Sequence, residues 1–328
     1  MSTTIEDLPA DRVVAPIIAS MLEAIGDTPV VRLQKIVPPD CADIYVKLES
    51  FNPTGSYKDR MALAMIEEAE SRGDLRPGMT VVEYTAGSTG SSLALICAVK
   101  GYRFEVVTSD AFSHEKLKTM EALGAHLNLI PSNDGRITAE LVERMMERAG
   151  ELAARSDSYF TNQLHNRDSL VGYRRVGEEL LKQVGETIDV FVAAVGTAGL
   201  LMGVAQALKE RGSATRIVAL EPASSPVIST GESGSHHVEG IGIGFVPPLL
   251  DPDLYDDVLA IEEEDARKIA HRLAREEGVF AGTSTGLNVA GAIGIAKEIG
   301  PGHTVVTVAV DTGLKYVGDL YSQSTEIV

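Results

Sequence analysis

Short, almost continuously apolar runs alternate with helical stretches along most of the chain, and this alternation limits the folds that it can adopt. Runs such as 188–195 and 304–310 consist mainly of Val, Ile, Ala and Thr. Such runs are typical of parallel strands that are covered on both faces. Strands that alternate with helices form right-handed βαβ units. The sequence therefore predicts an α/β protein with doubly wound, mostly parallel sheets.

The predicted elements account for most of the 328 residues, which leave room for about two domains. The predicted strands lie at 43–49, 80–83, 103–108, 126–130, 188–195, 216–220 and 304–310. The predicted helices lie at 58–72, 88–100, 113–123, 138–155, 170–183, 198–209, 264–277 and 285–299. A polar stretch at 131–135 and the helix after it lead out of a first sheet, and the run at 188–195 opens a second.

Charge and cysteine content exclude several classes of partner. The net charge of −18 argues against binding to nucleic acid or to an anionic membrane. Cys41 and Cys97 have no second Cys or His at metal-ligand spacing, and adjacent His236 and His237 point different ways on an extended chain. No metal site is predicted. The acidic N-terminus and the lack of an apolar run of about 20 residues predict a cytoplasmic protein with a small-molecule partner.

The loop at 51–60, FNPTGSYKDR, follows the predicted strand at 43–49 and leads into a helix. Lys58 falls in the first turn of that helix. The positive end of the helix dipole disfavours a cation there and favours the neutral, nucleophilic amine. A functional lysine and a surface lysine that pairs with Asp59 or Glu67 both fit this position.

Three further loops place glycines and hydroxyls at the start of a helix, directly after a predicted strand or an apolar run. They are 84–92 (YTAGSTGSS), 195–203 (VGTAGLLMG) and 281–289 (AGTSTGLNV). Open α/β sheets bind ligands beyond the carboxyl ends of their strands, and backbone N–H groups in such turns bind carboxylates or phosphates. Simple helix capping is the alternative, although it explains one hydroxyl of 281–289 and not three.

In this order, the four loops resemble the cysteine synthase/cystathionine β-synthase family of pyridoxal-phosphate enzymes. The resemblance also rests on IGDTPVVRL (25–33), YFTNQLHN (159–166), EPASSPV (221–227), EGIGIGFVP (239–247) and VAVDTGLKY (308–316). It implies the fold-type II architecture of tryptophan synthase β-like enzymes, pyridoxal 5'-phosphate as cofactor and a homodimer. It also implies a smaller α/β domain at 42–158 and a larger one formed by 14–41 and 159–328.

The resemblance implies a role for each candidate residue. Lys58 is the implied catalytic residue, as Schiff-base lysine and as the base that removes the α-proton. The implied cofactor-binding residues are Lys58, Ser88, Gly196, Thr197, Ala198, Gly199 and Ser284. The implied substrate-binding residues are Thr85, Ala86, Gly87, Ser88, Thr89, Gln163 and Gly240. Ser284 would face the pyridine nitrogen, where a neutral hydroxyl favours loss of a β-substituent over transamination.

Two positions depart from the family pattern. Ser88 stands where the family usually has an asparagine beside the phenolic oxygen of the cofactor. Leu200 stands where the phosphate turn usually carries a second hydroxyl. One hydrogen bond to the phosphate, worth on the order of 1 kcal/mol or somewhat more, is therefore either missing or supplied elsewhere.

The implied function is a cysteine synthase-like β-replacement, in which O-acetylserine or O-phosphoserine reacts through an aminoacrylate with sulfide or another small nucleophile. If Ser88 holds the ring differently, the aminoacrylate is released and hydrolysed by water to pyruvate and ammonia. With cysteine as substrate, the protein would then be a desulfhydrase. A cystathionine β-synthase-like condensation and a non-catalytic family member are further alternatives. A nucleotide-binding oxidoreductase is disfavoured, because no GxGxxG opens a βαβ unit with an acidic residue about 20 positions on.

Overall fold

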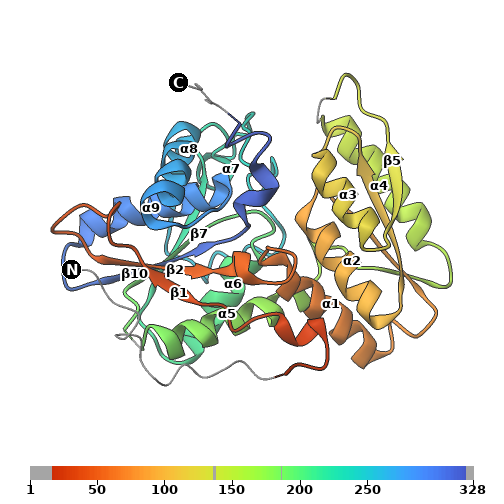
Figure 1. Cartoon of the computed structure of the whole chain (residues 1–328), viewed down its shortest axis with the longest axis horizontal. Coiled ribbons are helices and arrows are strands. Elements are labelled where there is room, and N and C mark those ends of the chain that lie inside the picture. Colours follow the sequence, from red (N-terminus) through yellow and green to blue (C-terminus); the bar gives the residue numbers. More distant parts are fainter. Residues whose placement is uncertain (1–16, 136–137, 186, 323–328) are drawn as a thin grey trace.

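The structure is a computed structural model that describes residues 17–135, 138–185 and 187–322. Its strands form two sheets (Figure 1). The six-stranded sheet has the order β1-β2-β10-β7-β8-β9 and is parallel except for β1, which runs antiparallel to β2. The four-stranded sheet has the order β5-β4-β3-β6 and is parallel throughout. The strands are β1 Val30–Arg32, β2 Asp43–Leu48, β3 Thr80–Tyr84, β4 Arg103–Ser109, β5 His126–Ile130, β6 Ser158–Phe160, β7 Val190–Ala194, β8 Arg216–Pro222, β9 Asp257–Ile261 and β10 Thr304–Ala309.

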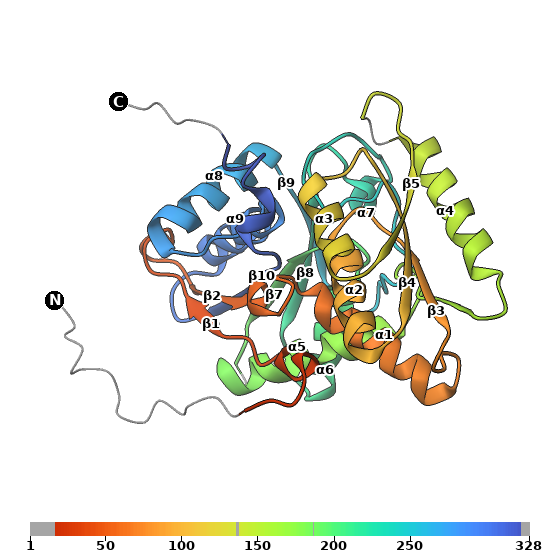
Figure 2. The ribbon, with the colours of Figure 1, turned by 45° about the vertical axis from the view of Figure 1, so that its right-hand side comes forward.

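Helices cover both faces of each sheet. In Figure 2, α8 and α9 lie on one side of the six-stranded sheet and α5 and α6 on the other, while α4 lies opposite α1, α2 and α3 across the smaller sheet. The helices are α1 Lys58–Arg72, α2 Ser88–Lys100, α3 His114–Ala122, α4 Ala139–Ala153, α5 Asp168–Gln183, α6 Gly199–Glu210, α7 Val227–Thr230, α8 Glu263–Arg272 and α9 Thr283–Ile299. Among the residues that the structure describes, no helix is long and apolar enough to cross a membrane.

The predicted mostly parallel α/β architecture is confirmed. The two central strands β7 and β10 are buried along almost their whole length, as their apolar composition predicts. The helices α1 and α2 have the predicted bounds. Each ends where a glycine adopts a left-handed conformation, Gly73 and Gly101 with φ of 79°, which costs glycine little.

The strand at 43–48 lies in a different place from the one predicted. It is β2, which pairs with β1 and β10 in the six-stranded sheet, and not with the strands of the smaller domain expected at 42–158. The prediction also lacks β1, β6 and β9, each of which has three to five residues. β6 pairs with β3, so the smaller sheet also extends beyond the expected end at residue 158. If the smaller domain starts after β2 and ends after β6, the division into a smaller and a larger domain stays a proposal. Residues 14–16, 186 and 323–328 of the expected larger domain, and residues 136–137 of the smaller one, lie outside the described residues.

A buried network of charged side chains ties the first turn of α1 to β2 and α5. Arg60 donates to both Glu49 oxygens at 2.7 and 2.8 Å and to both Glu179 oxygens at 2.6 and 2.8 Å. Lys47 donates to Glu179 at 2.6 Å. Burial alone would raise the pKa of Glu179, but the hydrogen bonds and charges of Arg60 and Lys47 outweigh it and lower that pKa to about 2. Two cations thus balance two carboxylates beneath the start of α1.

Candidate active site

The turn that precedes Lys58 is attached to the carboxyl end of β10. The Tyr57 N–H donates to the Val310 carbonyl at 2.9 Å. The Thr312 N–H donates to the Gly55 carbonyl at 2.8 Å. Gly55 has a φ of 71°, and a Cβ at this position would lie 2.5 Å from Thr312 Cγ2. The turn therefore requires glycine, and it starts α1 at a fixed place beside a central strand.

Lys58 is buried without a carboxylate partner. Lys58 is 6% exposed, and its Nζ lies 4.7 Å from the centroid of the Tyr57 ring. In the described ranges no carboxylate lies within ion-pair distance of this amine. Two other buried lysines differ in this respect, because Lys47 pairs with Glu179 and Lys116 pairs with Glu239. A buried amine that no carboxylate neutralises is available to a ligand.

The loop at 85–89 meets Gln163 from a distant part of the sequence. The Thr89 hydroxyl donates to Gln163 Oε1 at 2.7 Å, and the Gly87 N–H donates to Thr85 Oγ1 at 3.1 Å. α2 begins at Ser88, so the loop presents the free N–H groups of a helix start. The expected joint position of the loop and Gln163 is therefore present, with hydroxyl, amide and backbone donors that suit a carboxylate.

Glu83 holds the loop at 85–89 and Gln163 in place through hydrogen bonds to the residues beside them. It is wholly buried at the end of β3, and one of its oxygens accepts from the Thr161 hydroxyl at 2.7 Å and from the Gln163 N–H at 3.0 Å. Its other oxygen accepts from the Tyr84 N–H at 3.0 Å. Burial raises the pKa of Glu83 to about 7, although these hydrogen bonds and the charge of Lys58 act in the opposite direction. Glu83 thus fixes the backbone on both sides of the candidate carboxylate site.

This raised pKa predicts a pH dependence of stability. The folded protein keeps the Glu83 proton up to about pH 7, whereas the unfolded chain loses it near pH 4.3. Between these values the folded state binds more protons, so stability falls as the pH rises, by roughly 4 kcal/mol in total for this group. Glu83→Gln removes this slope. Urea unfolding of both proteins from pH 4.5 to 8 measures it, and an identical pH dependence in both would contradict the assignment.

The turn at 196–199 forms a cradle of backbone groups at the start of α6. Ala198 has a φ of 67°, a left-handed conformation that alanine rarely adopts. A Cβ at Gly196 would lie 2.2 Å from the Gly240 carbonyl oxygen, so the two expected site segments touch only because residue 196 is glycine. α6 begins at Gly199, whose N–H donates to Thr197 Oγ1 at 3.4 Å. Backbone N–H groups at the start of a helix suit an anion.

Ser284 lies at the start of α9, next to the end of β10. It is buried in the first turn of α9. The next residue, Thr285, accepts the Val310 N–H at 3.1 Å, and the Gly282 N–H donates to the Asp311 carbonyl at 3.3 Å. The end of β10 therefore carries both the start of α9 and the turn before Lys58.

Asp311 lies in the VAVDTGLKY motif (308–316), but the sequence analysis assigned it no role. It accepts the Ser56 hydroxyl at 2.6 Å on one oxygen and the Ser88 hydroxyl at 2.5 Å on the other. Lys315 Nζ lies 3.5 Å from Asp311 and donates to Ser88 Oγ at 3.2 Å. Burial alone would raise the pKa of Asp311, but Lys315 and the two serine hydroxyls outweigh it and lower that pKa. Ser88, an expected cofactor contact, thus donates its hydroxyl hydrogen bond to Asp311 in this structure.

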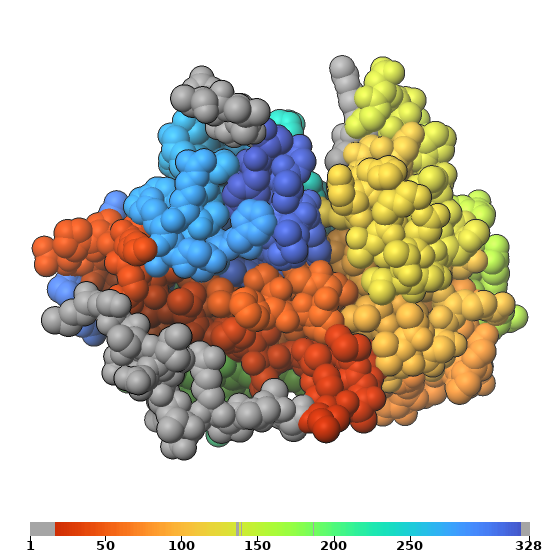
Figure 3. Space-filling model, viewed as in Figure 1, coloured from red at the N-terminus to blue at the C-terminus, as the bar shows by residue number. Residues whose placement is uncertain are grey.

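Lys116 and Glu239 connect the two sides of the site. Lys116 lies on α3 and pairs with Glu239, next to Gly240, while its Nζ lies 4.9 Å from the centroid of the Tyr316 ring. A Cβ at Gly87 would lie 2.7 Å from Lys116 Cδ, so the lysine stem covers the loop at 85–89. Figure 3 shows a hollow between the yellow segment that contains α3 and the blue C-terminal segment that contains Tyr316. Sequence spacing carries no signal for this contact between remote segments.

Comparison with known proteins agrees with this geometry. The family described as "Pyridoxal-phosphate dependent enzyme" matches residues 21–311. A cysteine synthase of Staphylococcus aureus (strain Mu50 / ATCC 700699) is 42% identical over 306 residues, which cover 92% of this chain and 97% of that protein. A crystal structure of an O-ureido-L-serine synthase is similar, with a TM-score of 0.89, 38% identity and coverage of 95% and 97%. So is a hydrogen sulfide-producing enzyme from Fusobacterium nucleatum, with a TM-score of 0.85, 35% identity and coverage of 92% and 99%.

Proposed function

Because the chain belongs to the family of pyridoxal-phosphate-dependent enzymes, we propose that it catalyses a cysteine synthase-like β-replacement on an activated serine. The Cβ–O bond of O-acetylserine or O-phosphoserine breaks, acetate or phosphate leaves with the bonding electrons, and sulfide forms the new Cβ–S bond. One observation carries the proposal: the buried Lys58, which no carboxylate neutralises, begins α1 at the strand end that also holds Ser88 and the start of α9.

The residues present fit the cofactor. Lys58 would hold its aldehyde carbon, the turn at 196–199 its phosphate and Ser284 its ring nitrogen. The left-handed turn at Ala198 directly before α6 and the buried amine of Lys58 support these assignments. When bound, the cofactor supplies an electron sink for negative charge at the α-carbon of the substrate.

The side chains around this position supply binding and proton transfer. The N–H and hydroxyl groups of 85–89 and the amide of Gln163 bind the carboxylate of the substrate, and Glu83 keeps Gln163 in place. Lys58 Nζ accepts the α-proton of the substrate. Its burial keeps the amine away from bulk water during this transfer. Lys116 covers the loop and pairs with Glu239, so both domains surround the substrate.

The reaction is tested with purified protein, sulfide and one amino acid at a time: O-acetylserine, O-phosphoserine or serine. We expect cysteine from an activated serine, with one acetate or phosphate released for each cysteine formed. Hydroxyurea replaces sulfide in a parallel reaction, because one similar structure is that of an O-ureido-L-serine synthase. The proposed use of sulfide would be contradicted if neither activated serine gave cysteine with sulfide. It would also be contradicted if an activated serine gave a product with hydroxyurea but none with sulfide.

A sulfide-releasing elimination is the second candidate. It is favoured by the similarity to a hydrogen sulfide-producing enzyme at 35% identity and by the engagement of Ser88 with Asp311, which leaves the expected ring contact to other groups. Cysteine as the sole substrate would then yield sulfide, pyruvate and ammonia. Release of sulfide from cysteine at a higher kcat/KM than cysteine synthesis would favour elimination over replacement.

Gly196→Ala tests the position of the phosphate turn. The added Cβ would lie 2.2 Å from the Gly240 carbonyl oxygen, so the turn must move. We expect affinity for pyridoxal phosphate to fall about tenfold or more, measured by titrating the apoprotein and following absorbance. Gly294→Ala is the control, because a Cβ at this position in α9 has no neighbour within 4 Å. Equal affinities of the two variants would contradict the assignment.

We also propose a cytoplasmic homodimer. Cys41 and Cys97 are both free thiols, as a reducing compartment allows, and the family resemblance supports the dimer. Sedimentation equilibrium of the holoenzyme, together with cell fractionation, measures both properties.

A further inference from the structure

Tyr173 carries a hydroxyl for which the described residues provide no partner. The residue lies on α5, has 0% of its surface exposed and has no hydrogen bond at its Oη. A buried hydroxyl without a partner costs about 1–3 kcal/mol, and native structures contain few such groups. A hydroxyl of this kind calls for a partner that the polypeptide itself does not supply.

The Tyr173 ring runs along α6 toward its N-terminal end. The Cβ of Tyr173 lies 2.7 Å from the position of a Cβ at Gly203. Its ring carbons Cε2 and Cδ2 lie 3.0 and 3.1 Å from the position of a Cβ at Gly199, one helical turn closer to the N-terminus. Because Cε2 is bonded to the carbon that bears the hydroxyl, Oη lies farther along the same direction. The two glycines thus form a groove that directs the hydroxyl toward the first turn of α6.

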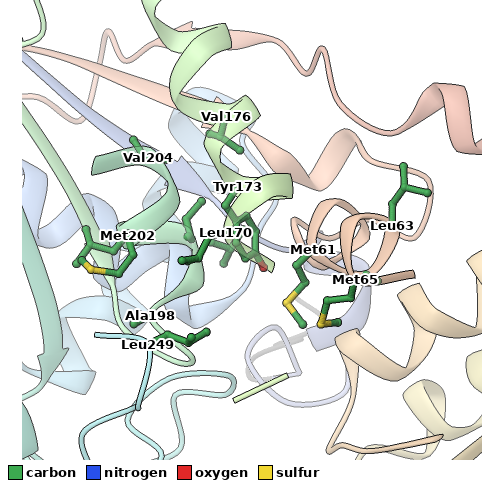
Figure 4. Packing of buried hydrophobic residues seen from close by; sticks show 14 of the residues in the cluster. Met61, Leu63, Met65, Leu170, Tyr173, Val176, Ala198, Met202, Val204 and Leu249 are labelled. Carbon is green, nitrogen blue, oxygen red and sulfur yellow. The ribbon is translucent and has the colours of Figure 1, made fainter. Parts of the chain in front are cut away.

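On its other side the ring faces the segment that begins α1. Tyr173 stacks on Tyr57, the residue before Lys58, with a centroid distance of 5.4 Å and an interplanar angle of 30°. Figure 4 shows the ring of Tyr173 extending from α5 between α6 and α1, with its oxygen on the side of Met61. The hydroxyl therefore lies between the start of α6 and the start of α1.

From this position we infer that the Tyr173 hydroxyl donates a hydrogen bond to the phosphate of the cofactor at the start of α6. The inference rests on the proposed placement of that phosphate at 196–199. Leu200 offers no hydroxyl in the first turn of α6, and the nearby Ser169 hydroxyl already donates to the Asn166 carbonyl at 2.8 Å. Burial raises the pKa of Tyr173 well above its usual range, so the phenol keeps its proton and acts as a donor.

Tyr173→Phe separates this role from a structural one, because it removes the oxygen and keeps the ring. We expect the apoprotein of this variant to be at least as stable to heat as the wild-type apoprotein, since a hydroxyl without a partner is lost. We expect its affinity for pyridoxal phosphate to fall about tenfold, since a hydrogen bond to a charged acceptor is lost. Pyridoxal, which has no phosphate, should bind both proteins equally. The ³¹P resonance of the bound cofactor should also shift in the variant.

Tyr102→Phe is the matched control. Its hydroxyl donates to Glu70 at 2.8 Å, so its removal should destabilise the apoprotein and leave the affinity for pyridoxal phosphate unchanged. An unchanged affinity in Tyr173→Phe, an equal loss of pyridoxal affinity or a destabilised apoprotein would each overturn the inference. These measurements use cofactor binding alone. They therefore stand even if the protein forms no cysteine, and a failed β-replacement does not affect them.

Discussion

Replacing Lys58 with alanine is expected to lower kcat for cysteine formation by about a thousandfold or more. The change removes the amine that would attach the cofactor and take the α-proton, and proton transfer by a positioned side chain alone contributes about 10²–10⁴-fold. Borohydride reduction followed by peptide mass spectrometry gives a second measurement. We expect the reduced cofactor on Lys58 in the wild type and on no lysine in the variant.

Lys118→Ala is the matched control for this experiment. Lys118 lies on α3, is largely exposed and pairs with Glu121, so its replacement changes the charge equally without reaching the site. The Lys118→Ala variant should form cysteine at the wild-type rate. Wild-type rates in Lys58→Ala, or a reduced cofactor on another residue, would show that Lys58 is not the attachment point.

Arg60→Met is expected to lower the free energy of unfolding by about 3–5 kcal/mol, the usual loss when one partner of a buried ion pair is removed. Arg60 supplies both cationic contacts to the fully buried Glu49, so that carboxylate is left without a cation. Methionine fills much of the same volume, and the loss therefore reports on charge more than on packing. Urea unfolding of the apoprotein at pH 7 measures the effect without a contribution from cofactor binding.

Arg60→Met should lower the free energy of unfolding by a smaller amount at acidic pH. The pKa of Glu179 is lowered to about 2 in the folded protein, so its stabilising contribution is complete above about pH 4.3 and is lost as the pH falls toward 2. The difference between wild type and variant should shrink over this range. Arg72→Met is the control, since Arg72 pairs with Asp74 and Asp168 at the surface and should lose less than about 1 kcal/mol. Equal small losses in both variants at pH 7 would contradict a stabilising role for the network.

Local sequence was sufficient for the long elements of the fold. The bounds of α1 and α2 follow from residues within each helix and from the glycine after it, and β7 and β10 follow from apolar runs that need cover on both faces. The strands β1, β6 and β9 are short, and their conformation depends on a neighbouring strand that is remote in the sequence. The composition of β2 likewise does not reveal its sheet, because its partners β1 and β10 are remote in the sequence and local residues do not specify them.

In the candidate site, too, some features were predictable from the sequence and others depend on the tertiary structure. The loops around Lys58, Ser88, Gly196 and Ser284 were recognisable because glycines and hydroxyls at a helix start bind anions whatever surrounds them. The hydrogen bonds of Asp311 to Ser56 and Ser88, the pairing of Lys116 with Glu239 and the direction of the Tyr173 hydroxyl join segments that lie far apart in the chain. Residue type defines what each side chain can donate or accept, but its partner is chosen by long-range packing, which no local pattern contains.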